Sequence, residues 1–196
     1  MRPVAKPGSI LRKYRRESGW TLAFVSERTG LPVSTLSRIE NDQISPTYGQ
    51  LSKLSNGLAI DIAKLLSAVP IESQDNKQRR SVNRIGSGEI LDMAQQTLRY
   101  LSSDILHKQF TPIIGEVKAR TLDEVDEFLS HPGEEFIFVI EGLLEFHTGA
   151  YAPVTLVPGE SVYFDSAMPH AYLAKGEDRC RILSICSAPW ITPEGR

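Results

Sequence analysis

The chain has 196 residues, of which 41% are hydrophobic and 23% are charged, with 22 Lys and Arg against 24 Asp and Glu. This composition is typical of a folded soluble protein and excludes a disordered or fibrous chain. Its apolar runs are too short for a transmembrane helix, and the basic N-terminus lacks the apolar block of a secretory signal. We therefore expect a cytoplasmic protein.

Charge is distributed unevenly along the chain. Residues 1–70 hold 10 Lys and Arg against 5 Asp and Glu, whereas residues 97–196 hold 8 against 15. A basic N-terminal part is typical of a domain that meets a polyanion. Chance segregation of solvent-exposed charge is the alternative interpretation.

The N-terminal part predicts five short helices, because apolar residues recur at helical spacing between capping residues and glycines. Pro32 stands just before the third of them, as is common at a helix start. The expected helices are 9–18, one capped by Thr21 and ending at Thr29-Gly30, 33–40, one starting at Ser45-Pro46-Thr47, and one from Asp61 to Leu66.

Residues 70–84 are polar and nearly free of large apolar side chains, which is typical of a linker. After them, short strands separated by Gly and Pro indicate a β-sandwich or barrel. The expected strands are 112–117, 135–140, 143–147, 154–157, 161–164 and 181–186. The fold prediction is thus an α+β chain of two domains, all-α at 1–69 and all-β at 85–196.

Cys180 and Cys186 lie on one predicted strand. Six residues of strand span roughly 20 Å, whereas a disulfide needs Cα atoms about 4.4–6.8 Å apart. We therefore expect two buried, reduced thiols, which suits a cytosolic protein.

A helix that ends at Gly30, a short turn and a second short helix have the shape of a helix-turn-helix motif. The second helix of such a motif enters the major groove of DNA, where Arg38 could bind guanine in a bidentate manner. Arginines on the first helix of the domain suit phosphate contacts. The residues expected to contact DNA are Val33, Ser34, Thr35, Ser37 and Arg38 in the second helix of the motif, and Arg12, Arg15 and Arg16 in the first helix of the domain.

These residues resemble the phage-repressor (Xre-type) helix-turn-helix family over residues 9–67. The resemblance rests on the Gly30 turn, on the run Ser-Thr-Leu-Ser-Arg-Ile-Glu at 34–40 and on Ser45-Pro46-Thr47. It implies binding to a double-stranded DNA operator. A helical bundle that reuses the fold without binding DNA is the alternative.

Two segments of the C-terminal part carry histidine, glutamate and glycine at fixed spacing. In the first, three residues separate His131 from Glu135 and six separate Glu135 from Gly142, and in the second, Gly159 precedes His170. The segments resemble the two signature motifs of the cupin superfamily. The resemblance implies a double-stranded β-helix barrel of the jelly-roll type.

The match to the cupin pattern, which covers residues 97–188, is incomplete. Leu129 stands where the first motif has its first histidine, so one of the usual four metal ligands is missing. Asp165 and Ala167 stand where the second motif has Pro and Gly. The resemblance is therefore stronger for the fold than for the chemistry.

His131, Glu135 and His170 would place two imidazoles and one carboxylate inside the barrel. Three such ligands leave open positions on iron(II), and zinc or nickel would fit the same set. In the alternative interpretation there is no metal: His131 belongs to a turn at the start of a strand, Glu135 binds a backbone amide, and Pro169-His170 shapes a loop.

The barrel is also expected to contain a ligand pocket. Ile137 and Val139 share strand parity with Glu135, and Tyr172 shares it with His170. These four residues, Ile137, Val139, His170 and Tyr172, are the predicted ligand-binding set.

Together these features favour a transcriptional regulator, not an enzyme, whose cupin domain binds a small-molecule effector. Two chains would pair through the cupin domain as a homodimer, and the ligand signal would pass through the 70–84 linker. The alternative function is a mononuclear non-haem iron enzyme resembling hydroxypropylphosphonate epoxidase, which has a similar helical-plus-cupin architecture.

Overall fold

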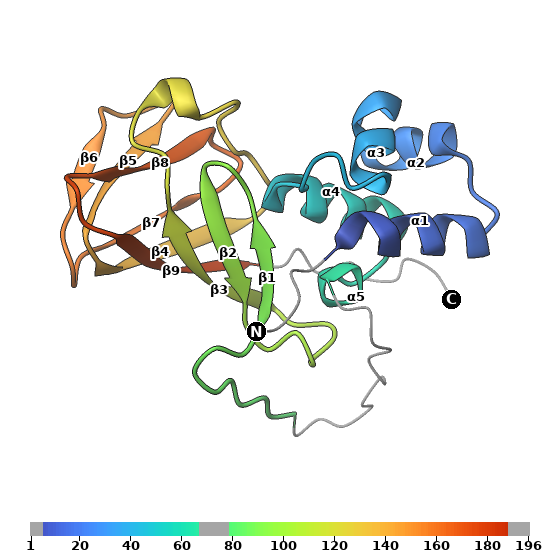
Figure 1. The fold of residues 1–196 in the computed structure, drawn as a ribbon, viewed down its shortest axis with the longest axis horizontal. Coiled ribbons are helices and arrows are strands. Elements are labelled where there is room, and N and C mark those ends of the chain that lie inside the picture. Colours follow the sequence, from blue (N-terminus) through green and yellow to red (C-terminus); the bar gives the residue numbers. More distant parts are fainter. Residues whose placement is uncertain (1–5, 67–78, 188–196) are drawn as a thin grey trace.

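The computed structural model describes residues 6–66 and 79–187. Its helices gather on one side and its strands form a barrel on the other, as Figure 1 shows. This arrangement confirms the predicted α+β fold with an all-α part followed by an all-β part. Within the described residues, no helix is long and apolar enough to cross a membrane.

The five predicted helices are present, and local capping explains their ends. Thr21 caps α2 by accepting a hydrogen bond from the Phe24 amide at 3.1 Å, and Gly30 ends the helix with φ of 70°. Asp61 accepts a 2.8 Å bond from the Ala63 amide at the start of α5. The helices are α1 (Pro7–Glu17), α2 (Leu22–Thr29), α3 (Val33–Glu40), α4 (Tyr48–Leu58) and α5 (Ile62–Leu66).

The barrel consists of two antiparallel sheets, ordered β1-β2-β3-β9-β4-β7 and β6-β5-β8. Inward-facing residues alternate with outward-facing ones, most regularly along β9. The strands are β1 (Glu89–Asp92), β2 (Gln96–Tyr100), β3 (Phe110–Val117), β4 (Glu134–Glu141), β5 (Leu143–Thr148), β6 (Val154–Leu156), β7 (Ser161–Asp165), β8 (His170–Lys175) and β9 (Cys180–Ser187).

Three of these strands, β1, β2 and β8, are not among the six expected ones. β1 and β2 are short and pair with each other at the sheet edge, where few apolar residues mark them. In β8 five consecutive residues are buried, so the polar–apolar alternation that indicates a half-exposed strand does not occur.

One hydrophobic core connects the helices with the end of the barrel. It runs from residues such as Leu51 and Leu54 on α4 to Leu91, Tyr100 and Ile113 on the barrel strands. A second core fills the rest of the barrel. The helical part therefore rests directly on the barrel, and α4 lies at the junction (Figure 1).

Most of the expected linker, residues 70–78, lies outside the described residues. Its last part, 79–84, runs alongside the loop between β2 and β3. There Ser81 donates a 2.6 Å hydrogen bond to Asp104, and Asn83 accepts one of 2.9 Å from the Ser102 amide. Residues 79–84 are therefore held against the barrel.

Candidate functional site

Three residues expected to hold a metal come together at the end of the barrel beside α4. His131 lies on the loop before β4, Glu135 is the second residue of β4, and His170 is the first residue of β8. The backbone amide of His131 donates to the Ser166 carbonyl at 2.9 Å, which fixes this loop beside the turn between β7 and β8. All three side chains are buried.

The two imidazoles converge on one oxygen of Glu135. His131 Nε2 lies 3.1 Å from Glu135 Oε2, and His170 Nε2 lies 3.6 Å from the same oxygen. The other carboxylate oxygen accepts a 2.6 Å hydrogen bond from the Ser184 hydroxyl. Burial by itself raises the pKa of Glu135, but the hydrogen bond from His131 and the charge of His170 outweigh it and hold this pKa below its ordinary value.

His170 carries its hydrogen on the nitrogen that points away from this cluster. Its Nδ1 lies 2.8 Å from the Met168 carbonyl oxygen, which can only accept, so Nδ1 is the donor. Burial lowers the pKa of His170 from its ordinary value. Its Nε2 lies 3.6 Å from Glu135 Oε2 and has no hydrogen-bond partner.

A bound cation would satisfy both the unpaired nitrogen and the carboxylate oxygen. A histidine that donates one ring N–H to a backbone carbonyl and aims the other nitrogen inward is the usual arrangement around a bound metal. The donor types of His131, Glu135 and His170 therefore allow a divalent metal at this place.

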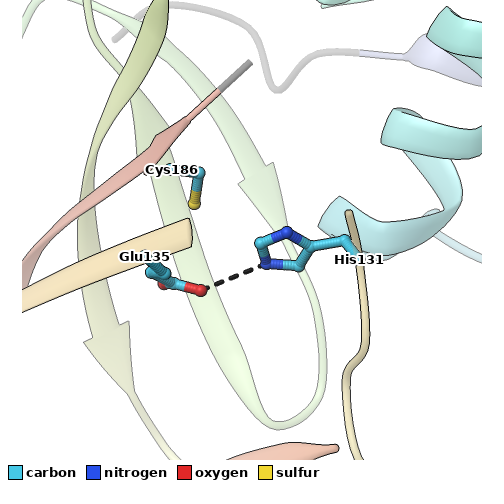
Figure 2. A group of neighbouring side chains, drawn as sticks. All are labelled: His131, Glu135 and Cys186. Atoms are coloured by element: carbon cyan, nitrogen blue, oxygen red, sulfur yellow. Dashed lines mark hydrogen bonds and ion pairs between the residues drawn. The ribbon is translucent and has the colours of Figure 1, made fainter. Parts of the chain in front are cut away.

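Sequence analysis missed a fourth residue of this cluster, Cys186. One donor atom from each of His131, Glu135 and Cys186 lies within 4.8 Å of the others. Figure 2 shows these three side chains gathered at one place. Both cysteines are buried and do not pair with each other, as expected. Burial and the charge of Glu135 raise the pKa of the Cys186 thiol well above its ordinary value. The pairing of β4 with β9 is the signal that could have found it, because it sets Glu135 opposite Cys186.

A small cavity of about 20 Å³, roughly the space of one water molecule, lies among these donors. His170 and Tyr172 line it, as expected, together with apolar side chains such as Leu98. Ile137 and Val139 lie elsewhere: both are fully buried in the barrel core. Apolar walls and converging polar groups are typical of a ligand site, and the space between these side chains suits an ion or a water-sized ligand.

The helical part contributes one wall of this pocket through Tyr48, the first residue of α4, which sequence analysis did not select. Its ring meets the His131 ring edge-on, with centroids 4.6 Å apart. A capping box between Thr47 and Gln50 fixes this end of α4. At Gly49, an added Cβ would lie 2.7 Å from the Ser130 carbonyl oxygen, so only glycine permits this close approach.

The expected DNA-contacting residues of α3 occupy its solvent-facing side. Val33, which is 45% exposed, and Ser34 and Arg38 are open to solvent, and Thr35 and Ser37 are half-buried. Leu36 and Ile39 anchor the opposite side in the core. The helix thus presents polar and basic groups outward and apolar groups inward, as a recognition helix does.

The three arginines of α1 differ in their surroundings. Arg12 and Arg16 are exposed. Arg15 instead forms a bidentate ion pair with the buried Glu40 of α3, at 2.7 and 2.8 Å, and donates a further bond to the Trp20 carbonyl. Its guanidinium is therefore committed to holding α1 against α3.

Comparisons with known proteins agree with the two-part architecture. Residues 11–65 match the family described as helix-turn-helix, and residues 122–186 match the family described as cupin domain. The chain is 25% identical over 182 residues to the HTH-type transcriptional regulator PuuR of Escherichia coli (strain K12), covering 91% of this chain and 92% of that one. It is 26% identical over 187 residues to SutR of the same strain, with 92% and 94% covered.

Among solved structures, an HTH_3 family transcriptional regulator from Vibrio cholerae has the same fold, with a TM-score of 0.61, 19% identity, and 95% and 97% of the two chains covered. Hydroxypropylphosphonic acid epoxidase from S. wedmorenis aligns with a TM-score of only 0.47 at 19% identity, over 93% and 97%. The chain is thus a two-domain protein of helix-turn-helix and cupin type, homologous along nearly its whole length to the regulators PuuR and SutR.

Proposed function

We propose that this protein is a cytoplasmic, DNA-binding transcriptional regulator whose cupin pocket takes a divalent metal and a small-molecule effector. The observation that carries the proposal is homology to two named regulators over nine-tenths of the chain, joined to an exposed recognition helix. Two free, buried thiols support a cytoplasmic location, where reducing conditions keep cysteines unpaired.

DNA binding is assigned to the outer side of α3 and to α1. Arg38 binds a guanine edge, Val33 and Ser34 lie at the end of α3 that enters the major groove, and Arg12 and Arg16 bind phosphates. Thr35 and Ser37, which are half-buried, flank them.

The pocket supports the metal and effector part of the proposal. His131, Glu135 and His170 offer two imidazoles and a carboxylate in a buried site, and the metal supplies a positive charge that an anionic or oxygen-bearing effector can share. Around it, Tyr172 and the apolar walls shape the space that the effector occupies.

Tyr48 supports a direct route from the pocket to the DNA-binding part, in place of the linker route expected from sequence. An effector that changes the position of His131 also changes the contact that holds the first turn of α4. A tenfold change in DNA affinity requires the effector to distinguish the two arrangements by about 1.4 kcal/mol.

A homodimer is proposed through the outer face of the large sheet. Phe138 on β4 lies opposite Leu183 on β9, which lies opposite Ile114 on β3, and Phe136 lies opposite Tyr163 on β7. Phe138 and Tyr163 are exposed by 37% and 62%. A contiguous apolar patch of this kind is typical of an interface, and pairing would bring two recognition helices to one DNA site.

A non-haem iron enzyme is the second candidate. The observation that favours it is the convergence of two histidines and one glutamate, the donor set of iron(II) oxygenases. Binding to a defined DNA site by the isolated protein separates the two functions, because an enzyme of this architecture has no need for it.

The decisive experiment measures binding to the DNA upstream of the protein's own gene by fluorescence anisotropy. Arg38→Ala should weaken specific binding by roughly 1–3 kcal/mol, because a bidentate contact to guanine is lost. The matched control is Arg84→Ala, which removes the same charge at an exposed position away from α3. Equal affinities of the wild type and Arg38→Ala for this site would exclude Arg38 from base reading, and no specific binding by the wild type would contradict the regulator.

A further inference from the structure

The two cysteines of β9 have different surroundings. Cys180 lies in the second core of the barrel, among apolar side chains. Cys186, six residues further along the same strand, lines the pocket, and strand pairing places it directly opposite Glu135. Only Cys186 therefore stands among metal-ligating groups.

The donors around Cys186 are close enough to share one ion. Donor atoms of His131, Glu135 and Cys186 all lie within 4.8 Å of one another, and all three residues are buried. The sulfur lies 3.4 Å from the Ser184 hydroxyl, whose hydrogen bond to Glu135 links the thiol to the carboxylate.

A second observation points to a ligand at this place. The side chain of His170 is fully buried, and its Nε2 has no hydrogen-bond partner and lies 3.6 Å from Glu135 Oε2. Native proteins rarely leave such a group unpaired without a bound water, ion or ligand. Two buried nitrogens of the cluster, Nε2 of His170 and Nδ1 of His131, are thus without a hydrogen-bond partner.

We propose that Cys186 is a thiolate ligand of the metal, beside His131 and Glu135, and that the resident ion is one that accepts sulfur, with zinc the best match. This inference rests on the metal site proposed above and names its ligand and its metal class. Thiolate favours zinc and other softer ions, whereas two imidazoles and a carboxylate alone would suit iron(II).

Ligation by Cys186 has a defined chemical balance. A metal–sulfur bond forms, the S–H bond breaks, and the proton passes to solvent, with no change in oxidation state. His170 then stands as a further donor or as the neighbour of a position left open to the effector, which is the arrangement of zinc sites that bind a second molecule.

The test is a titration of the metal-free protein with cobalt(II), which replaces zinc and has a visible and near-ultraviolet spectrum. The wild type should bind cobalt stoichiometrically and develop the intense near-ultraviolet absorption of sulfur-to-cobalt charge transfer. Zinc added afterwards should displace the cobalt and abolish the absorption.

Variants assign the absorption to one sulfur. Cys186→Ser should lose the absorption and bind cobalt at least about tenfold more weakly. Cys180→Ser, the matched control on the same strand, should retain both. His170→Gln should keep the absorption, because the thiolate remains. Circular dichroism of each metal-free variant checks the fold. The cobalt spectrum of the wild type tests for a sulfur ligand without any substitution.

The outcomes separate this inference from the function on which it rests. Cobalt binding by the wild type without sulfur absorption overturns the role of Cys186 but leaves the metal site in place. Absorption that survives in Cys186→Ser overturns it as well. Failure of the wild type to bind either cobalt or zinc overturns the metal site itself, together with its thiolate ligand, while DNA binding stays independently measurable.

Discussion

Arg15 and Arg16 are adjacent in the sequence, yet their side chains do different things. Arg15 pairs with Glu40 at 2.7 Å, and the two side chains are 16% and 4% exposed. This contact raises the pKa of Arg15 above its ordinary value, chiefly through the hydrogen bond with Glu40. Arg16 is open to solvent. The basic residues of α1 are therefore not equivalent, and burial decides which of their side chains are free to contact a partner.

This difference predicts opposite effects of two substitutions. Arg15→Ala leaves the buried Glu40 carboxylate without its partner and should lower the free energy of unfolding by about 2 kcal/mol. Arg16→Ala should leave the free energy of unfolding unchanged. It should instead reduce the slope of log affinity for DNA against log salt concentration by about one, because one phosphate contact is lost. Urea unfolding and anisotropy at several salt concentrations measure the two effects. A loss of stability in Arg16→Ala, or none in Arg15→Ala, would reverse these assignments.

At the scale of elements, α4 joins the two functional parts. Its first residue, Tyr48, touches His131, while its second, Gly49, packs against the Ser130 carbonyl. The loop that carries His131 and the helix that follows the recognition helix therefore share one interface. Movement of either element requires adjustment of the other.

Gly49→Ala tests this interface. The added methyl group would lie 2.7 Å from the Ser130 carbonyl oxygen, so α4 or the loop must move apart, at a cost of about 1–3 kcal/mol in unfolding free energy. Gly149→Ala is the matched control, because its nearest neighbours, on Pro169, are 4.0 Å away. A Gly49→Ala variant with wild-type stability would show that α4 and the loop can move apart without cost.

At the scale of the whole molecule, the large sheet has two different faces. Its inner face builds the pocket, and its outer face exposes a row of apolar side chains across β3, β9, β4 and β7. One sheet thereby connects the site to the proposed dimer contact.

Phe138→Asp should convert the dimer to a monomer, because it places a charge in the centre of the apolar face. Analytical ultracentrifugation measures the mass of the particle in solution. The affinity for DNA should fall by about 100-fold or more, because the two DNA-binding parts are no longer linked. Tyr151→Asp, at a residue 73% exposed on the loop between β5 and β6, should change neither. A Phe138→Asp protein that remains dimeric would place the interface elsewhere.

The sequence by itself determined the helices, most of the strands and the two-part architecture. Capping residues such as Thr21 and Asp61, the turn at Gly30 and the change from helical to strand periodicity are local signals, so they can be read without the fold. It also determined His131, Glu135 and His170 as one candidate metal cluster, because their spacing resembles the cupin motifs.

Only the tertiary structure decided which other residues lie at that cluster, and which predicted site residues lie elsewhere. Cys186 and Tyr48 reach the pocket because β9 pairs with β4 and α4 packs against the barrel, and both contacts join segments far apart in the chain. Arg15 meets Glu40 and Ile137 enters the core for the same reason. Pairing and burial depend on contacts between distant segments, which local sequence patterns do not encode.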